Sequence, residues 1–150
     1  MDSNIIGYGE LKFRAIRPST NQWVYGANVS LEATINTPNI IRLSKFFELI
    51  ELGQFKKTTL SQYIGRKDKN GKEIFRGDIV LLKWQKYDRG IYEVKFGEGC
   101  NHGAGDSSGY FYGYYLQTAE EVHSDYLIED DMNLEVVGDI FNNPELLKEA

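Results

Sequence analysis

The sequence predicts a mainly β fold of the α+β class: a bent antiparallel sheet or small, partly open barrel with one packed helix at about residues 38–52 and a short C-terminal helix. Three observations support this prediction. Several segments alternate apolar with polar residues, which is the period of a half-buried strand. Aromatic residues, which favour strands, make up 13% of the chain. Tight-turn signals separate the strand-like segments. A length of 150 residues fits one domain, residues 1–150.

The first part of the chain predicts three strands and one helix. Residues 11–17 and 22–25 flank a turn at residues 18–21, and residues 29–35 alternate again. Thr37 is suited to cap a helix, and Pro38 is suited to its first position. Apolar residues then recur at helical spacing until Gly53, which is placed to end the helix.

Residues 62–80 predict a β-hairpin. Apolar and aromatic residues flank the pair Asn70-Gly71, which is the preferred sequence of a two-residue type I′ turn. Both central residues of that turn need a positive φ, which asparagine tolerates and glycine adopts without steric cost. The sequence therefore predicts a type I′ turn at these two residues.

The second half of the chain continues in strands. Residues 78–84 and 91–96 are expected to pair, and further strands are expected at residues 109–116 and 134–141. Asn143 and Pro144 then provide a cap and a first helical residue for the short C-terminal helix. The hairpins imply antiparallel pairing. The sequence shows no strand–helix–strand alternation, so a doubly wound sheet is not expected.

The charge of the chain is unevenly distributed. The formal net charge is −5, yet residues 56–95 hold eleven basic and five acidic residues, which gives this window +6 and the remainder −11. Such a surface fits a phosphate backbone, the acidic part of a neighbouring subunit, or a solvated hairpin whose lysines protect an edge strand. The candidate binding residues are Arg66, Lys67, Lys69, Lys72 and Arg76.

Aromatic residues interleave with this basic window. In proteins that bind single strands, such rings form stacking platforms beside a basic groove, but the same pattern arises in the core of an aromatic-rich barrel. Both interpretations stay open for Tyr63, Phe75, Trp84, Tyr87, Tyr92 and Phe96.

The glycine-rich segment 97–109 is the remaining candidate site. It holds Cys100, His102 and Asp106, which could begin a metal site or provide a cysteine–histidine catalytic pair. Metal-site spacings are absent, and the neighbouring acids oppose an activated thiol. A surface loop is the alternative. We therefore expect no catalytic residue, no metal and no cofactor.

Cysteine content and hydropathy indicate in which cellular compartment the protein is expected. A single cysteine excludes a disulfide within the chain and favours a cytosolic protein. The N-terminal residues lack the features of a signal peptide, and no apolar run approaches the roughly 20 residues of a membrane span. We expect a cytoplasmic protein that does not contact a membrane.

Four blocks of sequence resemble the YopX family of small bacteriophage and prophage proteins: residues 12–15, 62–80, 94–97 and 134–147. They span nearly the whole chain in the order that the family shows. The resemblance implies a phage or prophage gene expressed in a bacterial cytoplasm, and a β-rich domain that assembles into a homo-oligomer. It transfers no activity, cofactor or catalytic residue.

Together these features predict a non-enzymatic binding or assembly module that acts as a homo-oligomer and has an unidentified host or phage protein partner. A nucleic-acid-binding accessory protein that uses the basic hairpin is the alternative. An enzyme or metal site in segment 97–109 is a further alternative.

Overall fold

The computed structural model describes residues 11–28, 39–84, 88–101, 109–118, 125–129 and 132–148. The chain divides into two compact units, residues 1–65 and 66–150. The expectation of one domain for residues 1–150 stays a prediction.

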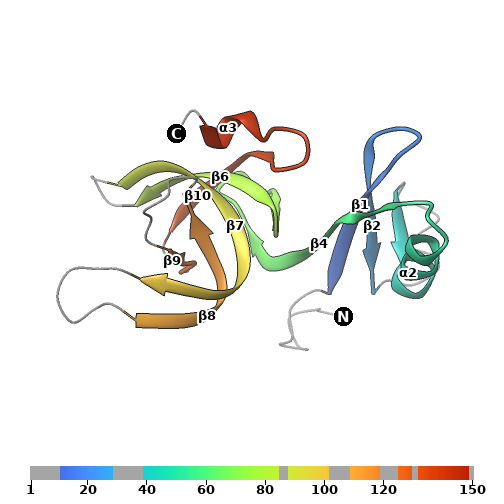
Figure 1. Cartoon of the computed structure of the whole chain (residues 1–150), viewed down its shortest axis with the longest axis horizontal. Helices are drawn as coiled ribbons and strands as arrows, with labels where there is room; N and C mark the ends of the chain where they lie inside the picture. The colour runs from blue at the N-terminus through green and yellow to red at the C-terminus, as the bar shows by residue number, and fades with distance from the viewer. Residues whose placement is uncertain are drawn as a thin grey trace. The chain divides into compact units, whose positions relative to one another are not determined.

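The first unit contains strands β1 (Lys12–Arg17), β2 (Gln22–Ala27), β3 (Ile40–Arg42) and most of β4 (Lys56–Lys67), together with helix α2 (Leu43–Glu51) (Figure 1). The strand order of the first sheet is β3-β2-β1-β4-β5, in which β5 (Glu73–Phe75) follows the unit boundary along the chain. Strands β1 and β2 form an antiparallel hairpin with Lys12 opposite Ala27 and Arg17 opposite Gln22. The turns predicted at residues 18–21 and the pairing of the flanking strands are thereby confirmed.

Helix α2 is shorter than the predicted helix at about residues 38–52. It begins at Leu43, because residues 40–42 form β3 and pair in parallel with β2. Asn39 takes a left-handed φ of 66°, and its carbonyl accepts a hydrogen bond from Tyr25 N at 2.7 Å, so the chain turns into β3 here and is not yet helical. This parallel pair also corrects the expectation of wholly antiparallel pairing. Thr37 and Pro38 lie outside the described residues.

The end of α2 is confirmed. Gly53 N donates to Ile50 O at 3.0 Å, and Gln54 N donates to Leu49 O at 2.9 Å. Gly53 has a φ of 76°. These two bonds and the left-handed glycine make a Schellman motif, which satisfies the last carbonyl groups of the helix.

The core of the first unit lies between α2 and the sheet. Phe46 and Ile50 of α2 pack with Ala15, Val24 and Phe55. Gly26 of β2 lies directly beneath Phe46: a Cβ at this position would stand 2.7 Å from Phe46 Cβ. The ring therefore fits because β2 presents no side chain there.

The second unit is built on an antiparallel sheet of order β10-β6-β7-β8-β9. Its strands are β6 (Asp78–Trp84), β7 (Asp88–Asn101), β8 (Gly109–Gln117), β9 (Tyr126–Leu127) and β10 (Asn133–Asp139), and the short helix α3 (Glu145–Lys148) follows. The predicted pairing of β6 with β7 is confirmed, with Ile79 opposite Glu93. Among the described strands neither sheet closes into a barrel, and the mainly β fold class is confirmed.

Both faces of the second sheet contribute buried side chains. The fully buried apolar residues of this unit are Ile74, Phe75, Ile79, Val80, Leu82, Val94, Leu116 and Leu134. No helix in the described part of the chain is long and apolar enough to cross a membrane.

Both ends of segment 97–109 lie in strands rather than in the surface loop that its glycines suggest. Residues 97–101 belong to β7, and residue 109 belongs to β8, with Gly97 opposite Gly113 and Asn101 opposite Gly109. Backbone pairing with the aromatic strand β8 overrides the low strand propensity of glycine. At Gly99 the missing side chain leaves room for the Phe111 ring. Residues 102–108 lie outside the described residues.

The packing of the first unit gives a stability prediction. We expect Gly26→Ala to lower the free energy of unfolding by about 2 kcal/mol, because overpacking against a fixed core ring typically costs that much. Chemical denaturation measures it. The matched control is Gly53→Ala, whose new methyl group would meet nothing within 4 Å. Its cost, about 1 kcal/mol, arises from the left-handed backbone alone. An equal or smaller loss for Gly26→Ala would contradict this account of the core.

Candidate functional site

The five predicted cationic residues lie around one hairpin of the second unit. Arg66 and Lys67 end β4, Lys69 and Lys72 belong to the turn of residues 68–72, and Arg76 lies between β5 and β6. The predicted hairpin is confirmed, since β4 and β5 are neighbours in the first sheet.

The turn itself is not type I′. Gly71 has a φ of 83°, but Asn70 does not take a positive φ. Gly71 N donates to Asp68 O at 3.0 Å, and Asp68 N donates to Lys72 O at 2.7 Å. This is the pattern of a three-residue loop that ends in a left-handed glycine.

The side chain of Asp68 is the reason for the longer turn. Its Oδ1 accepts hydrogen bonds from Asn70 N at 2.8 Å and from Lys72 N at 2.9 Å. A local carboxylate that satisfies two turn amides stabilises this loop in preference to a two-residue turn. The Asn70-Gly71 pair therefore predicts the position of the turn, but Asp68 decides its type.

Asp68 also binds a distant strand. Its Oδ2 accepts a hydrogen bond from Val136 N of β10 at 2.9 Å, and Lys69 N donates to Leu134 O at 2.9 Å. The turn thereby satisfies backbone groups on the outer edge of β10, which would otherwise be open to pairing with another chain.

The hydrogen bonds to Asp68 control its ionisation. Only 8% of the residue is exposed. Burial alone would raise the pKa of the carboxyl, but the bonds from Val136, Lys72 and Asn70 N–H, aided by the charge of Lys72, outweigh burial and hold the pKa below its ordinary value. Asp68 therefore acts as a fixed anion that organises the backbone.

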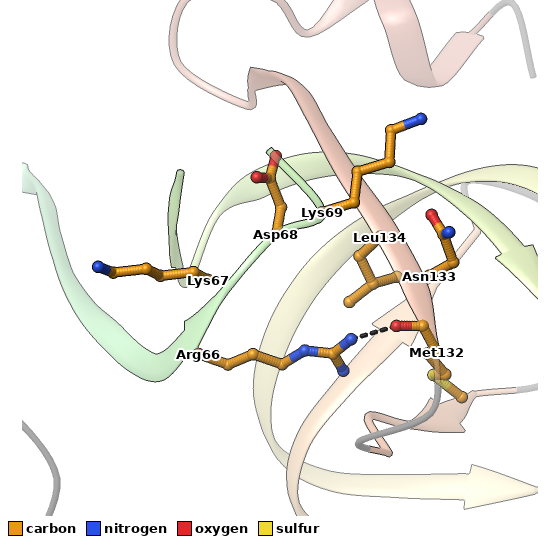
Figure 2. A pocket seen from close by; sticks show the side chains of 7 residues that line it. All are labelled: Arg66, Lys67, Asp68, Lys69, Met132, Asn133 and Leu134. Atoms are coloured by element: carbon orange, nitrogen blue, oxygen red, sulfur yellow. Dashed lines mark hydrogen bonds between the residues drawn. The ribbon is translucent and has the colours of Figure 1, made fainter. Parts of the chain in front are cut away.

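Arg66 is held by the segment that precedes β10. Its Nη1 donates to Glu129 O at 2.6 Å, and its Nη2 donates to Met132 O (Figure 2). The guanidinium thus bridges two backbone carbonyl groups 63 and 66 residues further along the chain.

The remaining cations divide into two groups. Lys69 Nζ forms an ion pair with Glu135 Oε1 at 3.2 Å. Lys67, Lys72 and Arg76 are exposed. Arg66 and Lys69 thus have partners within the unit, and Lys69, like the other three, is exposed.

A pocket of about 270 Å³ lies between this turn and β10. The residues that line it are Arg66, Lys67, Asp68, Lys69, Met132, Asn133 and Leu134 (Figure 2). The side chain of Lys67 points away from Arg66 and Met132 (Figure 2). Three of the five predicted residues meet here, whereas Lys72 and Arg76 do not line the pocket. Its one carboxylate is already engaged by three N–H groups, so the pocket offers charge and shape rather than a reactive pair.

The residues Cys100, His102 and Asp106 are not brought together by anything the structure describes. Cys100 belongs to β7, and His102 and Asp106 lie outside the described residues. Within the described ranges, no group of three or more histidine, cysteine, aspartate or glutamate side chains could hold a metal ion. A site in this segment stays a prediction.

Most of the aromatic residues named for base stacking are core residues where the structure describes their side chains. Tyr63, Phe75 and Tyr92 are 7%, 2% and 7% exposed, so they cannot form a platform. Phe96, by contrast, is 44% exposed. The side chains of Trp84 and Tyr87 are not among those described.

Phe96 belongs to an exposed aromatic cluster, which we define as Phe96, Tyr112 and Tyr114. The centroid of the Phe96 ring lies 5.3 Å from that of Tyr112 and 4.6 Å from that of Tyr114. Tyr112 is 74% exposed. The density of tyrosine in β8 was the signal available in the sequence, but alternation alone does not show which rings lack a covering layer.

Arg76 gives the aromatic cluster a positive border. Burial raises the pKa of Tyr114, and the nearby Arg76 charge opposes that rise. Burial likewise raises the pKa of Glu93, against the charges of Lys95 and Arg76. The backbone agrees, because Gly77, the residue after Arg76, donates its N–H to Val94 O of β7 at 2.8 Å.

The network around Asp68 gives the second prediction. Asp68→Asn should lower the free energy of unfolding by about 2 kcal/mol, because one carboxylate oxygen becomes an N–H₂ group that cannot accept a backbone hydrogen bond. The matched control, Glu135→Gln, removes only the partly exposed ion pair with Lys69 and should cost at most about 0.5 kcal/mol. Chemical denaturation at neutral pH compares the two.

Acid titration of the same variant tests the ionisation of Asp68. Because its pKa is lowered in the folded state, its contribution to stability is complete above the unfolded pKa of about 3.9 and declines as the pH falls through the folded value. The stability difference between the wild type and Asp68→Asn should shrink below about pH 4. A difference that stays constant down to pH 2 would refute this account.

Three comparisons place the chain among known proteins. A family model described as YopX protein matches residues 12–148. A solved structure, the crystal structure of protein EF1440 from Enterococcus faecalis, is 18% identical, covers 91% of this chain and 97% of its own, and has a TM-score of 0.42. No curated protein matches. The resemblance predicted from the four sequence blocks is confirmed, and the chain belongs to the YopX family.

Proposed function

We propose that this protein is a non-enzymatic binding or assembly module that acts as a homo-oligomer. The observation that carries the proposal is the exposed aromatic cluster, in which Tyr112 is 74% and Phe96 is 44% exposed. Adjacent rings left in water are unfavourable, and aromatic residues are enriched at the centres of protein interfaces. The resemblance to phage and prophage proteins adds a bacterial cytoplasm as the proposed setting, with a host or phage protein as a further partner.

The charge distribution supports self-association. Residues 56–95 carry +6, and the remainder carries −11. Two copies of such a chain can bring regions of opposite sign together, and this attraction guides encounter more than it adds affinity.

The pocket beside Asp68 supports a non-enzymatic function. Its carboxylate accepts three backbone hydrogen bonds, and its arginine donates to two backbone carbonyl groups. Groups held in this way stabilise the fold and are not poised to exchange protons with a substrate.

Sedimentation velocity tests self-association directly. At about 100 μM chain, a concentration that populates even contacts of about −5.5 kcal/mol, we expect a species larger than one chain. Added salt should reduce the association without abolishing it, because the centre of the contact is apolar. A single-chain species at every concentration and at both low and high salt would refute the proposal.

Nucleic-acid binding is the second candidate, favoured by the exposed cations Lys67, Lys72 and Arg76. If these residues contact phosphates, binding to single-stranded DNA should weaken with salt with a logarithmic slope of about −2, as expected for three contacts. Lys67→Glu with Lys72→Glu should weaken binding at least tenfold. The matched control reverses two other exposed lysines, Lys45 and Lys148. No shift of DNA in a gel at low salt would eliminate this function.

A further inference from the structure

We propose that a second copy of this chain docks on the aromatic cluster through a two-fold contact, in which Arg76 of each copy meets Glu98 of the other. The inference rests on the proposed self-association and assigns it to a surface. The cluster and both charged residues belong to the second unit.

The aromatic cluster continues a buried face of the sheet beyond the core. Phe96 follows Val94 at the strand period of two residues along β7, and Tyr114 precedes Leu116 in the same way along β8. Val94 and Leu116 lie opposite one another and are both 0% exposed, whereas in the next pair Phe96 is 44% exposed and Tyr114 is half-buried, and Tyr112 beyond them is 74% exposed. This face of β7 and β8 therefore stays apolar beyond the residues that the rest of the chain buries.

Opposite charges border the cluster. Glu98 is paired with Tyr112 in the register of β7 and β8, so the two side chains share one face. Arg76 precedes Gly77, whose N donates to Val94 O of β7 at 2.8 Å, so the backbone brings Arg76 beside the strand that carries Phe96. Both charged residues are exposed, and neither forms an ion pair with another side chain in the described part of the chain.

This arrangement is self-complementary. In a two-fold contact the same patch serves both subunits, so residue i meets residue j and residue j meets residue i. The aromatic cluster satisfies that condition, because it has a cation near one ring and an anion beside another. Two copies would place ring against ring and form two Arg76–Glu98 pairs.

A protein surface fits the cluster better than a nucleic acid. Glu98 lies across from Tyr112, so a carboxylate borders the rings on which bases would stack. This charge would repel phosphates, whereas a second copy offers an arginine for each Glu98.

Charge exchange between copies tests the contact. Arg76→Glu and Glu98→Arg should each raise the dissociation constant for self-association at least tenfold, because like charges then meet twice. An equimolar mixture of the two variants should restore association, because each mixed pair again joins opposite charges. The double variant should associate as the wild type does. Sedimentation velocity measures all four samples, and circular dichroism checks that each is folded.

The outcomes separate this inference from the proposed function. If the wild type self-associates but Arg76→Glu, Glu98→Arg and Tyr112→Ser all leave the dissociation constant unchanged, the surface is wrong and the proposed function stands. If the single charge variants weaken association but their mixture does not restore it, the two-fold pairing is wrong. If Tyr112→Ser weakens binding to single-stranded DNA and not self-association, the cluster belongs to a nucleic-acid site. A wild type that never self-associates overturns both proposals.

Discussion

The carboxylate of Asp68 is the interaction on which the candidate site depends. One oxygen accepts two hydrogen bonds within the turn of residues 68–72, and the other accepts one from Val136, 68 residues further along the chain. A buried anion is unfavourable unless donors surround it, and here three backbone amides do so. The same bonds satisfy amides that the turn and the edge of β10 would otherwise leave unpaired. One side chain thus determines the shape of the turn and protects the sheet edge.

Because the turn is held against β10, some of the cationic side chains at the hairpin have hydrogen-bond or ion-pair partners within the described part of the second unit and others do not. Arg66 bridges two backbone carbonyl groups, and Lys69 pairs with Glu135, so both stabilise the second unit. Lys67, Lys72 and Arg76 stay exposed. Two of the five hairpin cations are therefore engaged within the unit. Arg76 lies beside β7, because the next residue, Gly77, donates its N–H to Val94 O, and this links the hairpin to the proposed contact between copies.

Local sequence patterns predicted the features that local physics decides. Alternation and turn residues gave the strands and the hairpin, and Gly53 marked the end of α2 because a helix end needs a left-handed residue. The start of α2 was misplaced because β3 pairs with a strand distant in sequence. The turn type was wrong because the side chain of Asp68, rather than the preferred φ of Asn70, decides it. Its bond to Val136 could not be inferred, since nothing in either segment encodes the register between them. Tertiary packing likewise decides which aromatic residues are covered: Tyr63, Phe75 and Tyr92 are buried, and Phe96 is exposed.

The size of the aromatic cluster limits what it can do in an interface. A tyrosine side chain that is 74% exposed offers on the order of 150 Å² to a partner, which corresponds to about 3–4 kcal/mol when fully buried. A two-fold contact buries Tyr112 twice and gains about 7 kcal/mol, but association itself costs about 4–15 kcal/mol. The rings alone therefore support at most a weak contact. A stable dimer needs roughly 800 Å² from each copy, so the surface around the rings must also take part. Arg76 and Glu98 then mainly determine how the two copies are oriented. The two-fold arrangement brings each Arg76 to a Glu98 of the other copy, whereas alignments that bring like charges together are disfavoured.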